Sequence, residues 1–194
     1  MFTGIVEAMG SLIKKDAKGT NVEFWFTCPF TQELKVDQSL AHNGVCLTVV
    51  EILGDQYRVT AIDETLQKTN MGDVAIGQKV NLERCMAANA RFDGHIVQGH
   101  VDLTGICTEI KDQQGSWEYR FSYPKISGHV TVEKGSICVN GTSLTVVDSQ
   151  DDSFTVCIIP YTYEHTIFHQ LRIGDRVNLE FDILGKYIKK LMQR

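Results

Sequence analysis

The chain has 194 residues and a mass of 21.8 kDa, which is room for one medium-sized domain or two small ones. Hydrophobic residues make up 43% of it and charged residues 22%, which is typical of a chain that folds around a core and excludes a disordered or collagen-like protein. The net charge of −5 excludes nucleic acid and anionic membranes as main partners. We expect a cytoplasmic protein, because the sequence shows neither an apolar run of the ~20 residues that span a bilayer nor the basic start of a secretory signal.

An internal repeat divides the chain into two halves. Residues 43–50, NGVCLTVV, return 97 positions later as NGTSLTVV, with six of the eight letters identical. The same offset relates GQKVNLE at 77–83 to GDRVNLE further on, and the pattern G-x-V-E-x-x-G from Gly4 returns as G-x-V-D-x-x-G from Gly99. Three blocks in one order indicate duplication rather than chance.

The repeat predicts two homologous domains, residues 1–90 and 91–183, followed by a tail at 184–194. Each half is rich in short alternating segments, and six or so strands in under 95 residues predict a small closed barrel. Helical turns are expected just before the last strand of each half, at 65–71 and 160–166. Alternating segments occur at 22–26, 57–60 and 119–122.

The tail predicts an amphipathic helix. From Ile183 onward its apolar residues recur at helical spacing, at Leu184, Tyr187, Ile188 and Leu191. Basic residues lie off that stripe, at Lys186, Lys189, Lys190 and Arg194. A helix of ~11 residues is marginal in water, so the stripe packs on its own barrel or on other subunits, and we expect self-association.

The six cysteines follow no metal-binding or redox spacing, since they form no C-x-x-C pair and have no histidines at zinc-finger distances. His165 and His169 are four residues apart without a third ligand nearby, so we expect no metal site. Most of the thiols are expected to be small buried groups. They lie at Cys28, Cys46, Cys85, Cys107, Cys138 and Cys157.

The repeated Asn-Gly motif places matching polar side chains on one strand of each half. Because neighbours on a strand face opposite sides, Cys46 and Thr48 share one face while Leu47 points to the core. Ser143 and Thr145 share a face in the second half, and Leu144 points inward. These pairs are either a ligand site or only good strand formers, and their repetition favours the site.

Several titratable residues are weaker candidates. His95 and His100 are five positions apart and share no face; His95 is expected to be structural, and His100, beside Gly99, is the better acid or base. Asp182 is placed to orient a base or is simply solvated. Lys134 is by itself more typical of a surface cation.

Together these motifs resemble the riboflavin synthase family of the alpha-chain type, and the resemblance spans nearly the whole chain. It rests on MFTGIV at the N-terminus, AHNGVCLTV at 41–49, ETL at 64–66, VNLER at 80–84, GHIVQGHVD at 94–102 and GTSLTV at 141–146.

The resemblance implies an all-β fold of tandem six-stranded Greek-key barrels with a short C-terminal α-helix, assembled as a homotrimer. It implies one 6,7-dimethyl-8-ribityllumazine bound in each barrel, with the first barrel of one subunit facing the second barrel of a neighbour. The implied reaction is a dismutation that gives riboflavin and 5-amino-6-ribitylaminouracil, without metal or added cofactor. In some organisms such a trimer docks with lumazine synthase.

The resemblance also implies site residues. The first pocket is expected to contain Gly4, Ile5, Val6, Cys46, Leu47, Thr48, Ala61, Ile62, Asp63, Glu64, Thr65 and Leu66. The second is expected to contain Gly99, His100, Val101, Lys134, Ser143, Leu144, Thr145, Cys157, Ile158, Ile159, Pro160, Tyr161 and Thr162. Ser143, His100 and Asp182 are expected to relay protons, with Cys46 as a nucleophile or a polar neighbour.

Two departures and one rival accompany the resemblance. Leu103 stands where many relatives have glycine and is expected to narrow the rim of the second pocket, and Asn140 stands where some have a carboxylate. The rival is the lumazine protein of luminous bacteria, which shares the fold but is a monomeric optical antenna. The intact second motif and the helical tail favour the enzyme.

Overall fold

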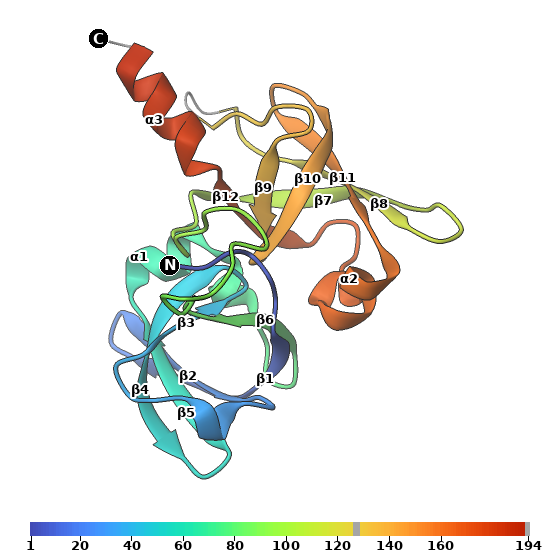
Figure 1. The fold of residues 1–194 in the computed structure, drawn as a ribbon. Helices are drawn as coiled ribbons and strands as arrows, with labels where there is room; N and C mark the ends of the chain where they lie inside the picture. Colours follow the sequence, from blue (N-terminus) through green and yellow to red (C-terminus); the bar gives the residue numbers. More distant parts are fainter. Residues whose placement is uncertain (126–128, 193–194) are drawn as a thin grey trace.

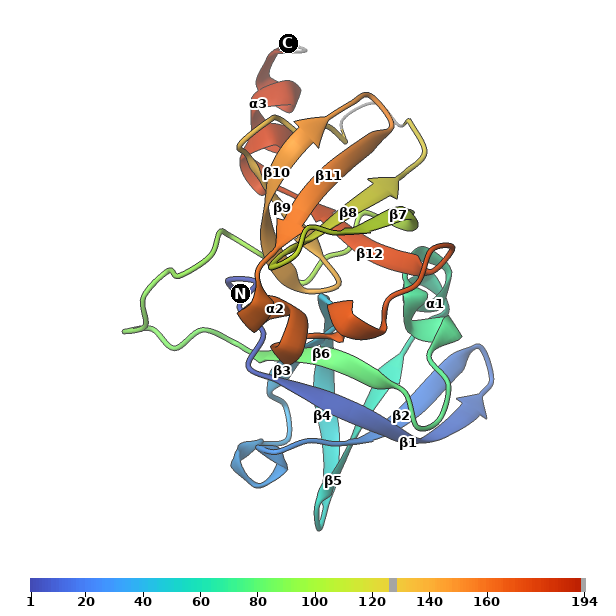
Figure 2. The ribbon, with the colours of Figure 1, turned by 90° about the vertical axis from the view of Figure 1, so that its right-hand side faces the viewer.

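The structure, a computed structural model, describes residues 1–125 and 129–192. It contains two closed antiparallel barrels of six strands each, so the predicted architecture is confirmed. Figure 1 shows both barrels, and the turned view of Figure 2 shows the second barrel above the first. Arg194 and the end of the predicted tail helix lie outside the described residues. No helix in the described ranges is long and apolar enough to cross a membrane.

The first barrel joins its strands in the order β1-β2-β5-β4-β3-β6. The strands are β1 (Ala8–Lys18), β2 (Asn21–Thr27), β3 (Ser39–His42), β4 (Val45–Leu53), β5 (Gln56–Ala61) and β6 (Lys79–Arg84). Short helices connect them, namely η1 (Thr31–Glu33), α1 (Asp63–Lys68) and η2 (Asn70–Asp73). The helix predicted at 65–71 therefore begins two residues earlier, where Asp63 and Glu64 place acidic side chains in its first turn.

The second barrel repeats this order as β10-β11-β8-β7-β12-β9. Its strands are β7 (Leu103–Asp112), β8 (Trp117–Ser122), β9 (Ser136–Val139), β10 (Thr142–Ser149), β11 (Ser153–Ile158) and β12 (Arg176–Phe181). The connecting helices are α2 (Pro160–His165) and η3 (Ile167–Gln170). Because β7 corresponds to β1, β8 to β2 and so on, the two barrels have one topology.

The alternation predicted for the repeated motif is confirmed. Leu47 lies in the core of the first barrel, whereas Cys46 is half-buried and Thr48 is exposed. In β10, Leu144 packs against the core of the second barrel while Thr145 is exposed. The polar members of both motifs therefore face away from the two cores.

The core of the first barrel contains a polar pair that the second lacks. His42 is fully buried; its Nε2 accepts a hydrogen bond from the Tyr57 hydroxyl at 2.9 Å, and its Nδ1 donates to the Leu40 carbonyl at 3.1 Å. Burial lowers the pKa of His42 to about 3. The equivalent residues of the second barrel are Val139 and Phe154, both fully buried.

Four buried asparagines join the barrels with local two-fold symmetry. Asn81 donates through Nδ2 to the Asn140 carbonyl at 2.8 Å, and Asn178 donates through Nδ2 to the Asn43 carbonyl at 2.9 Å. The Asn140 side chain accepts from the backbone N–H of Asn178 at 2.8 Å. Asn140 is therefore part of the joint between the barrels, and an amide oxygen is sufficient there.

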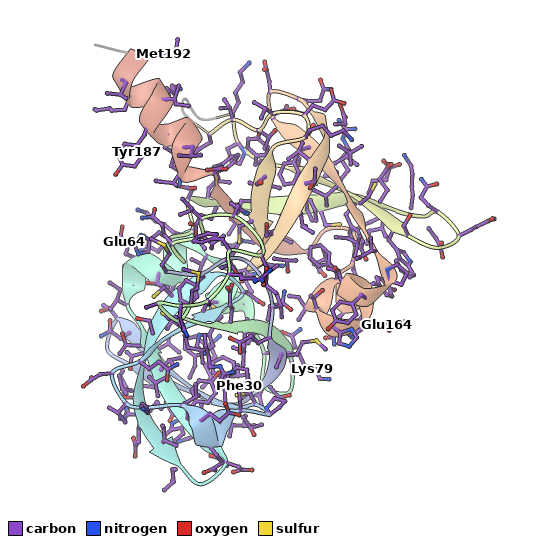
Figure 3. All side chains as sticks on the ribbon, in the orientation of Figure 1. Phe30, Glu64, Lys79, Glu164, Tyr187 and Met192 are labelled. Atoms are coloured by element: carbon purple, nitrogen blue, oxygen red, sulfur yellow. The ribbon has the colours of Figure 1, made fainter. Side chains whose placement is uncertain are left out.

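Helix α3 (Ile183–Met192) confirms the predicted tail helix and projects away from the second barrel (Figure 1). Figure 3 shows Tyr187 and Met192 standing clear of both barrels. Lys186, on the inner side, makes an ion pair of 2.6 Å with Asp102. The apolar stripe is between 58% and 65% exposed at Leu184, Tyr187, Ile188 and Leu191, so the helix does not fold back to cover it.

The prediction that most cysteines are buried is wrong. Only Cys107 and Cys138 are buried among the six, all of which are free thiols. Cys157 is exposed, because it follows the inward-facing Val156 on β11 and therefore points outward.

Candidate functional site

The chain entering each barrel runs along the opposite barrel. The Gly4 carbonyl accepts a hydrogen bond of 2.7 Å from the N–H of Ser143, on the second barrel. The Gly99 carbonyl accepts one of 2.9 Å from the N–H of Cys46, on the first barrel. Between these crossings the two entering segments pair through an antiparallel bridge of Phe2 with Val97, and Figure 1 shows the N-terminus beside the segment that precedes β7.

The crossing changes the expected composition of the two pockets. The resemblance implies a pocket of Gly4 with Cys46 and one of Gly99 with Ser143, whereas the backbone hydrogen bonds join each glycine to the other motif. The physical reason is the position of the entering segments at the joint between the barrels. There the first residues of β4 and β10 present N–H groups to the segment from the other half.

Both crossings require glycine. Gly4 has φ +78° and Gly99 φ +79°, in the left-handed region that side chains disfavour. A Cβ on Gly4 would lie 2.7 Å from the Ser143 Cβ, and one on Gly99 would lie 2.6 Å from the Cys46 Cβ. Only glycine therefore allows the backbone to come this close to Ser143 and to Cys46.

Ser143 is paired with a histidine that the sequence reading treats as structural. The His95 Nδ1 lies 2.6 Å from Ser143 Oγ. The backbone N–H of His95 donates to the Thr3 carbonyl at 3.1 Å. Burial lowers the pKa of His95, and the Asp182 carboxylate partly opposes this shift. A neutral imidazole therefore lies beside the Ser143 hydroxyl at neutral pH, with a carboxylate near enough to stabilise its protonated form.

His100 takes a different place from the expected one. Its side chain is exposed and its backbone N–H donates to Glu180 at 2.9 Å, beside the crossing that carries Cys46. Asp182 caps α3, because its Oδ1 accepts from the N–H of Leu184 at 3.0 Å. His95 rather than His100 therefore lies beside the Ser143 hydroxyl, and Asp182 is near enough to His95 to affect its pKa.

The Cys46 thiol has a different character from the Ser143 pair. Burial raises the pKa of Cys46, and a hydrogen bond with Ser39 only partly opposes the increase. The group is therefore a thiol rather than a thiolate at neutral pH, which makes it a weak nucleophile.

The other predicted site residues differ in exposure. Exposed residues are Ile5, Ile62, Asp63, Glu64, Lys134, Cys157, Ile159, Pro160 and Tyr161. Half-buried residues are Val6, Thr65, Leu66, Val101 and Thr162, and Ala61 and Ile158 are buried. Leu103 is not at a rim as expected: it begins β7 and packs in the core of the second barrel, because its side chain alternates inward.

Two cavities among the described residues lie away from the predicted site residues. A cavity of about 240 Å³ lies between the barrels, against Asn70, Arg176 and neighbouring residues. A wider one of about 1070 Å³ lies beside Tyr123, Lys125 and Asp151. Neither contains a predicted site residue. In the described part of the chain, no three His, Cys, Asp or Glu residues are grouped as metal ligands.

The comparisons with known proteins identify the family of this chain. The Lumazine binding domain family matches the chain twice, at residues 3–85 and 98–182. The chain is 43% identical to riboflavin synthase of Actinobacillus pleuropneumoniae, over 99% of this chain and 90% of that protein. It is 38% identical to riboflavin synthase of Bacillus subtilis strain 168, over 100% of this chain and 91% of that protein.

Solved structures with this fold include LumP in complex with riboflavin, at a TM-score of 0.86 and 23% identity, covering 93% of this chain and 99% of that one. LumP in complex with 6,7-dimethyl-8-(1'-D-ribityl) lumazine has a TM-score of 0.84 at 24% identity, covering 93% of this chain and 98% of that one. At such identities the likeness establishes the fold. With the two matched domains and the full-length relatives, the chain belongs to the riboflavin synthase family of lumazine-binding proteins.

Proposed function

We propose that the chain dismutates two molecules of 6,7-dimethyl-8-ribityllumazine to riboflavin and 5-amino-6-ribitylaminouracil. One lumazine gives a four-carbon unit to the other, so two identical substrates need two equivalent sites. The observation that carries the proposal is the pair of crossings, in which Gly4 meets Ser143 and Gly99 meets Cys46. Each crossing is a similar place for the same ring, with a different reactive side chain.

The crossings define which residues share a pocket in this proposal. The first pocket holds Cys46, Leu47, Thr48, Ala61, Ile62, Asp63, Glu64, Thr65 and Leu66, with Gly99, His100 and Val101 from the other half. The second pocket holds Ser143, Leu144, Thr145, Cys157, Ile158, Ile159, Pro160, Tyr161 and Thr162, with Gly4, Ile5 and Val6. Lys134, exposed in the loop before β9, is assigned to the second pocket as well.

The second pocket handles the proton. The C7 methyl of the lumazine is acidic because its deprotonated form is conjugated into the ring, so a modest base is sufficient. Ser143 and His95 supply that base, since the imidazole lies 2.6 Å from the hydroxyl and is neutral at neutral pH. Asp182 stabilises the imidazolium that forms, and Cys46 acts as a polar neighbour rather than as a thiolate.

A second chain completes the site. The two rings have to lie face to face, and such positioning can replace a large entropic barrier. Many of the predicted residues are exposed in the single chain, and the exposed stripe of α3 is available to hold subunits together. We infer a homotrimer in the cytoplasm in which the first barrel of one subunit faces the second barrel of the next; docking with lumazine synthase is a further expectation.

The test mixes purified protein with 6,7-dimethyl-8-ribityllumazine and a chelator, and follows the absorbance of lumazine and riboflavin. Two lumazines consumed for each riboflavin formed support the cofactor-free dismutation. Tight binding with unchanged lumazine contradicts it and favours the antenna.

Sedimentation tests the assembly. Leu191→Glu places a charge on the exposed stripe and is expected to give monomers without turnover. Ile76→Glu changes an isoleucine that is equally exposed on the first barrel and should leave the assembly intact. A wild-type chain that sediments as a monomer contradicts the trimer.

A further inference from the structure

Two buried glutamates hold the entering segments from inside the joint between the barrels. Glu83 and Glu180 are the second-to-last residues of β6 and β12, at equivalent positions of the repeat, and they are only 6% and 3% exposed. A carboxylate at such a site is costly unless its oxygens are hydrogen-bonded. Their partners are mostly backbone N–H groups of the entering segments, which is an unusual use of two buried charges.

The contacts of Glu83 fix the N-terminal segment. Its Oε1 accepts from the N–H of Thr3 at 2.7 Å and from the Thr3 hydroxyl at 2.9 Å, and its Oε2 accepts from the N–H of Gly4 at 3.0 Å. The carbonyl of Gly4 then accepts from Ser143 at 2.7 Å. A glutamate of the first barrel is therefore connected through one residue to the reactive serine of the second.

Glu180 repeats this arrangement for the other segment. Its oxygens accept from the N–H groups of Gln98 at 2.6 Å, Gly99 at 3.0 Å and His100 at 2.9 Å. The carbonyl of Gly99 accepts from Cys46 at 2.9 Å. A glutamate of the second barrel is thus connected to the thiol of the first.

The segments have no room to move between these contacts. On one side, carboxylate oxygens hold the N–H groups; on the other, the glycine backbones touch the Cβ atoms of Ser143 and Cys46 closely enough to exclude a side chain. Burial raises the pKa of both Glu83 and Glu180, and the N–H donors oppose that increase. A carboxylate can accept all of these hydrogen bonds, whereas a glutamine amide would turn an NH₂ group toward N–H donors.

We propose that Glu83 and Glu180 are positioning residues that act crosswise, each setting the ring-binding edge of the pocket whose reactive side chain belongs to the other barrel. Glu83 serves the pocket of Ser143, and Glu180 serves the pocket of Cys46. This inference rests on the proposed function, because the segments matter for turnover only if they receive the lumazine ring.

The test is a double-mutant cycle on the full chain, with turnover of lumazine measured after wild-type dismutation has been established. We expect Glu83→Gln to lower kcat about tenfold or more, because small displacements of a reacting group are costly. The loss of kcat should couple to that of Ser143→Ala, so that the double variant has a kcat only slightly below that of the less active single variant. Combined with Cys46→Ser, the two losses of kcat should instead multiply. Glu180→Gln should show the opposite pattern.

Three measurements separate positioning from general damage. Asp55→Asn removes a carboxylate from the exposed turn between β4 and β5 and should leave kcat and KM unchanged. Glu83→Asp and Glu180→Asp keep the acceptor oxygens and should recover part of the loss; they carry the cycle if the glutamine variants do not fold. Losses that couple within one barrel, or that multiply in every combination, overturn the proposal.

The outcome is distinguishable from failure of the proposed function. A wild-type chain that binds lumazine without forming riboflavin contradicts the dismutation, and the same cycle is then measured on lumazine affinity. Crosswise coupling in that affinity supports the positioning role, and its absence overturns it.

Discussion

The two barrels share one backbone plan but differ in the residues at its most sensitive points. At equivalent positions the first has Cys46 and the second Ser143, and His95 stands beside the serine alone. His95 lies outside the repeated block that begins at Gly4 in the first half and at Gly99 in the second. Duplication therefore accounts for two similar places for a ring. They differ chemically through Cys46 and Ser143 inside the repeat and through His95 outside it.

The same comparison extends to the residue that follows each entering segment. Glu7 accepts from the N–H of Arg84 at 2.7 Å and pairs with its guanidinium, both within the first barrel. Its equivalent, Asp102, accepts from the N–H of Phe181 at 2.9 Å but pairs with Lys186 of α3. The carboxylate at this position therefore pairs within the barrel in the first half, whereas in the second half it anchors the C-terminal helix.

The largest expected effect is a loss of stability on replacing the glycines at the two crossings, compared with glycines in open turns. Gly4→Ala and Gly99→Ala should each lower the free energy of unfolding by about 3 kcal/mol or more, from left-handed backbone plus steric overlap. Gly19→Ala and Gly54→Ala have similar φ but open space, and should cost about 1–2 kcal/mol. Urea unfolding measures all four, and equal losses would contradict the close approach at the crossings.

The next prediction separates the two reactive side chains. His95→Gln and Ser143→Ala should each lower kcat about a hundredfold, since they remove the proposed base and its partner. Cys46→Ser keeps a polar group and should lower it less than about tenfold. Steady-state measurement of kcat, on variants whose melting temperature is unchanged, tests this prediction. If Cys46→Ser lowers kcat as much as His95→Gln does, both pockets take part in proton transfer.

Acid should act on the first barrel more than on the second. Below pH 6.5 the unfolded chain protonates His42 while the folded chain does not until about pH 3, so stability falls as pH decreases, by about 1.4 kcal/mol per unit. The loss is about 2 kcal/mol at pH 5. The double variant His42→Val/Tyr57→Phe copies the second barrel and should lower this slope. Denaturant titrations from pH 7 to 5 that show an unchanged slope would contradict the prediction.

The smallest expected effect concerns the two ion pairs that follow the entering segments. Lys186→Met should weaken subunit association by less than about 1 kcal/mol, because the pair with Asp102 is only partly buried but orients α3. Arg84→Met removes the equivalent pair of the first barrel and should leave association unchanged. Sedimentation at several concentrations measures both, and equal shifts would show that the anchor is not specific to the second half.

Much of the fold was within reach of the sequence, because a repeat shows itself without any knowledge of contacts. The offset of 97 residues predicts two barrels, and the alternation around Cys46 predicts which side chains face outward. The crossing of the segments was not predictable, since it depends on where Gly4 and Gly99 lie relative to the other barrel. Burial of the thiols depends likewise on strand register, which places Cys157 outward.

The two buried glutamates of the site could have been recognised in the sequence. Glu83 and Glu180 end the same VNLE block in both halves, and a charged residue repeated at the end of an apolar strand suggests a buried role. His95 left no such signal, because it lies outside the repeated blocks. Its pairing with Ser143 joins residues 48 positions apart, and only the folded chain shows it.

The crossed segments also set an order of events during synthesis. Gly4 leaves the ribosome early, but its partner Ser143 follows 139 residues later, roughly 7–28 s at ordinary elongation rates. The first barrel can close in that interval, yet the N–H of Cys46 has no partner until Gly99 emerges. A nascent chain that has completed its first barrel is therefore folded but still exposes the unpaired N–H of Cys46. Only the second half of the same chain supplies the partner.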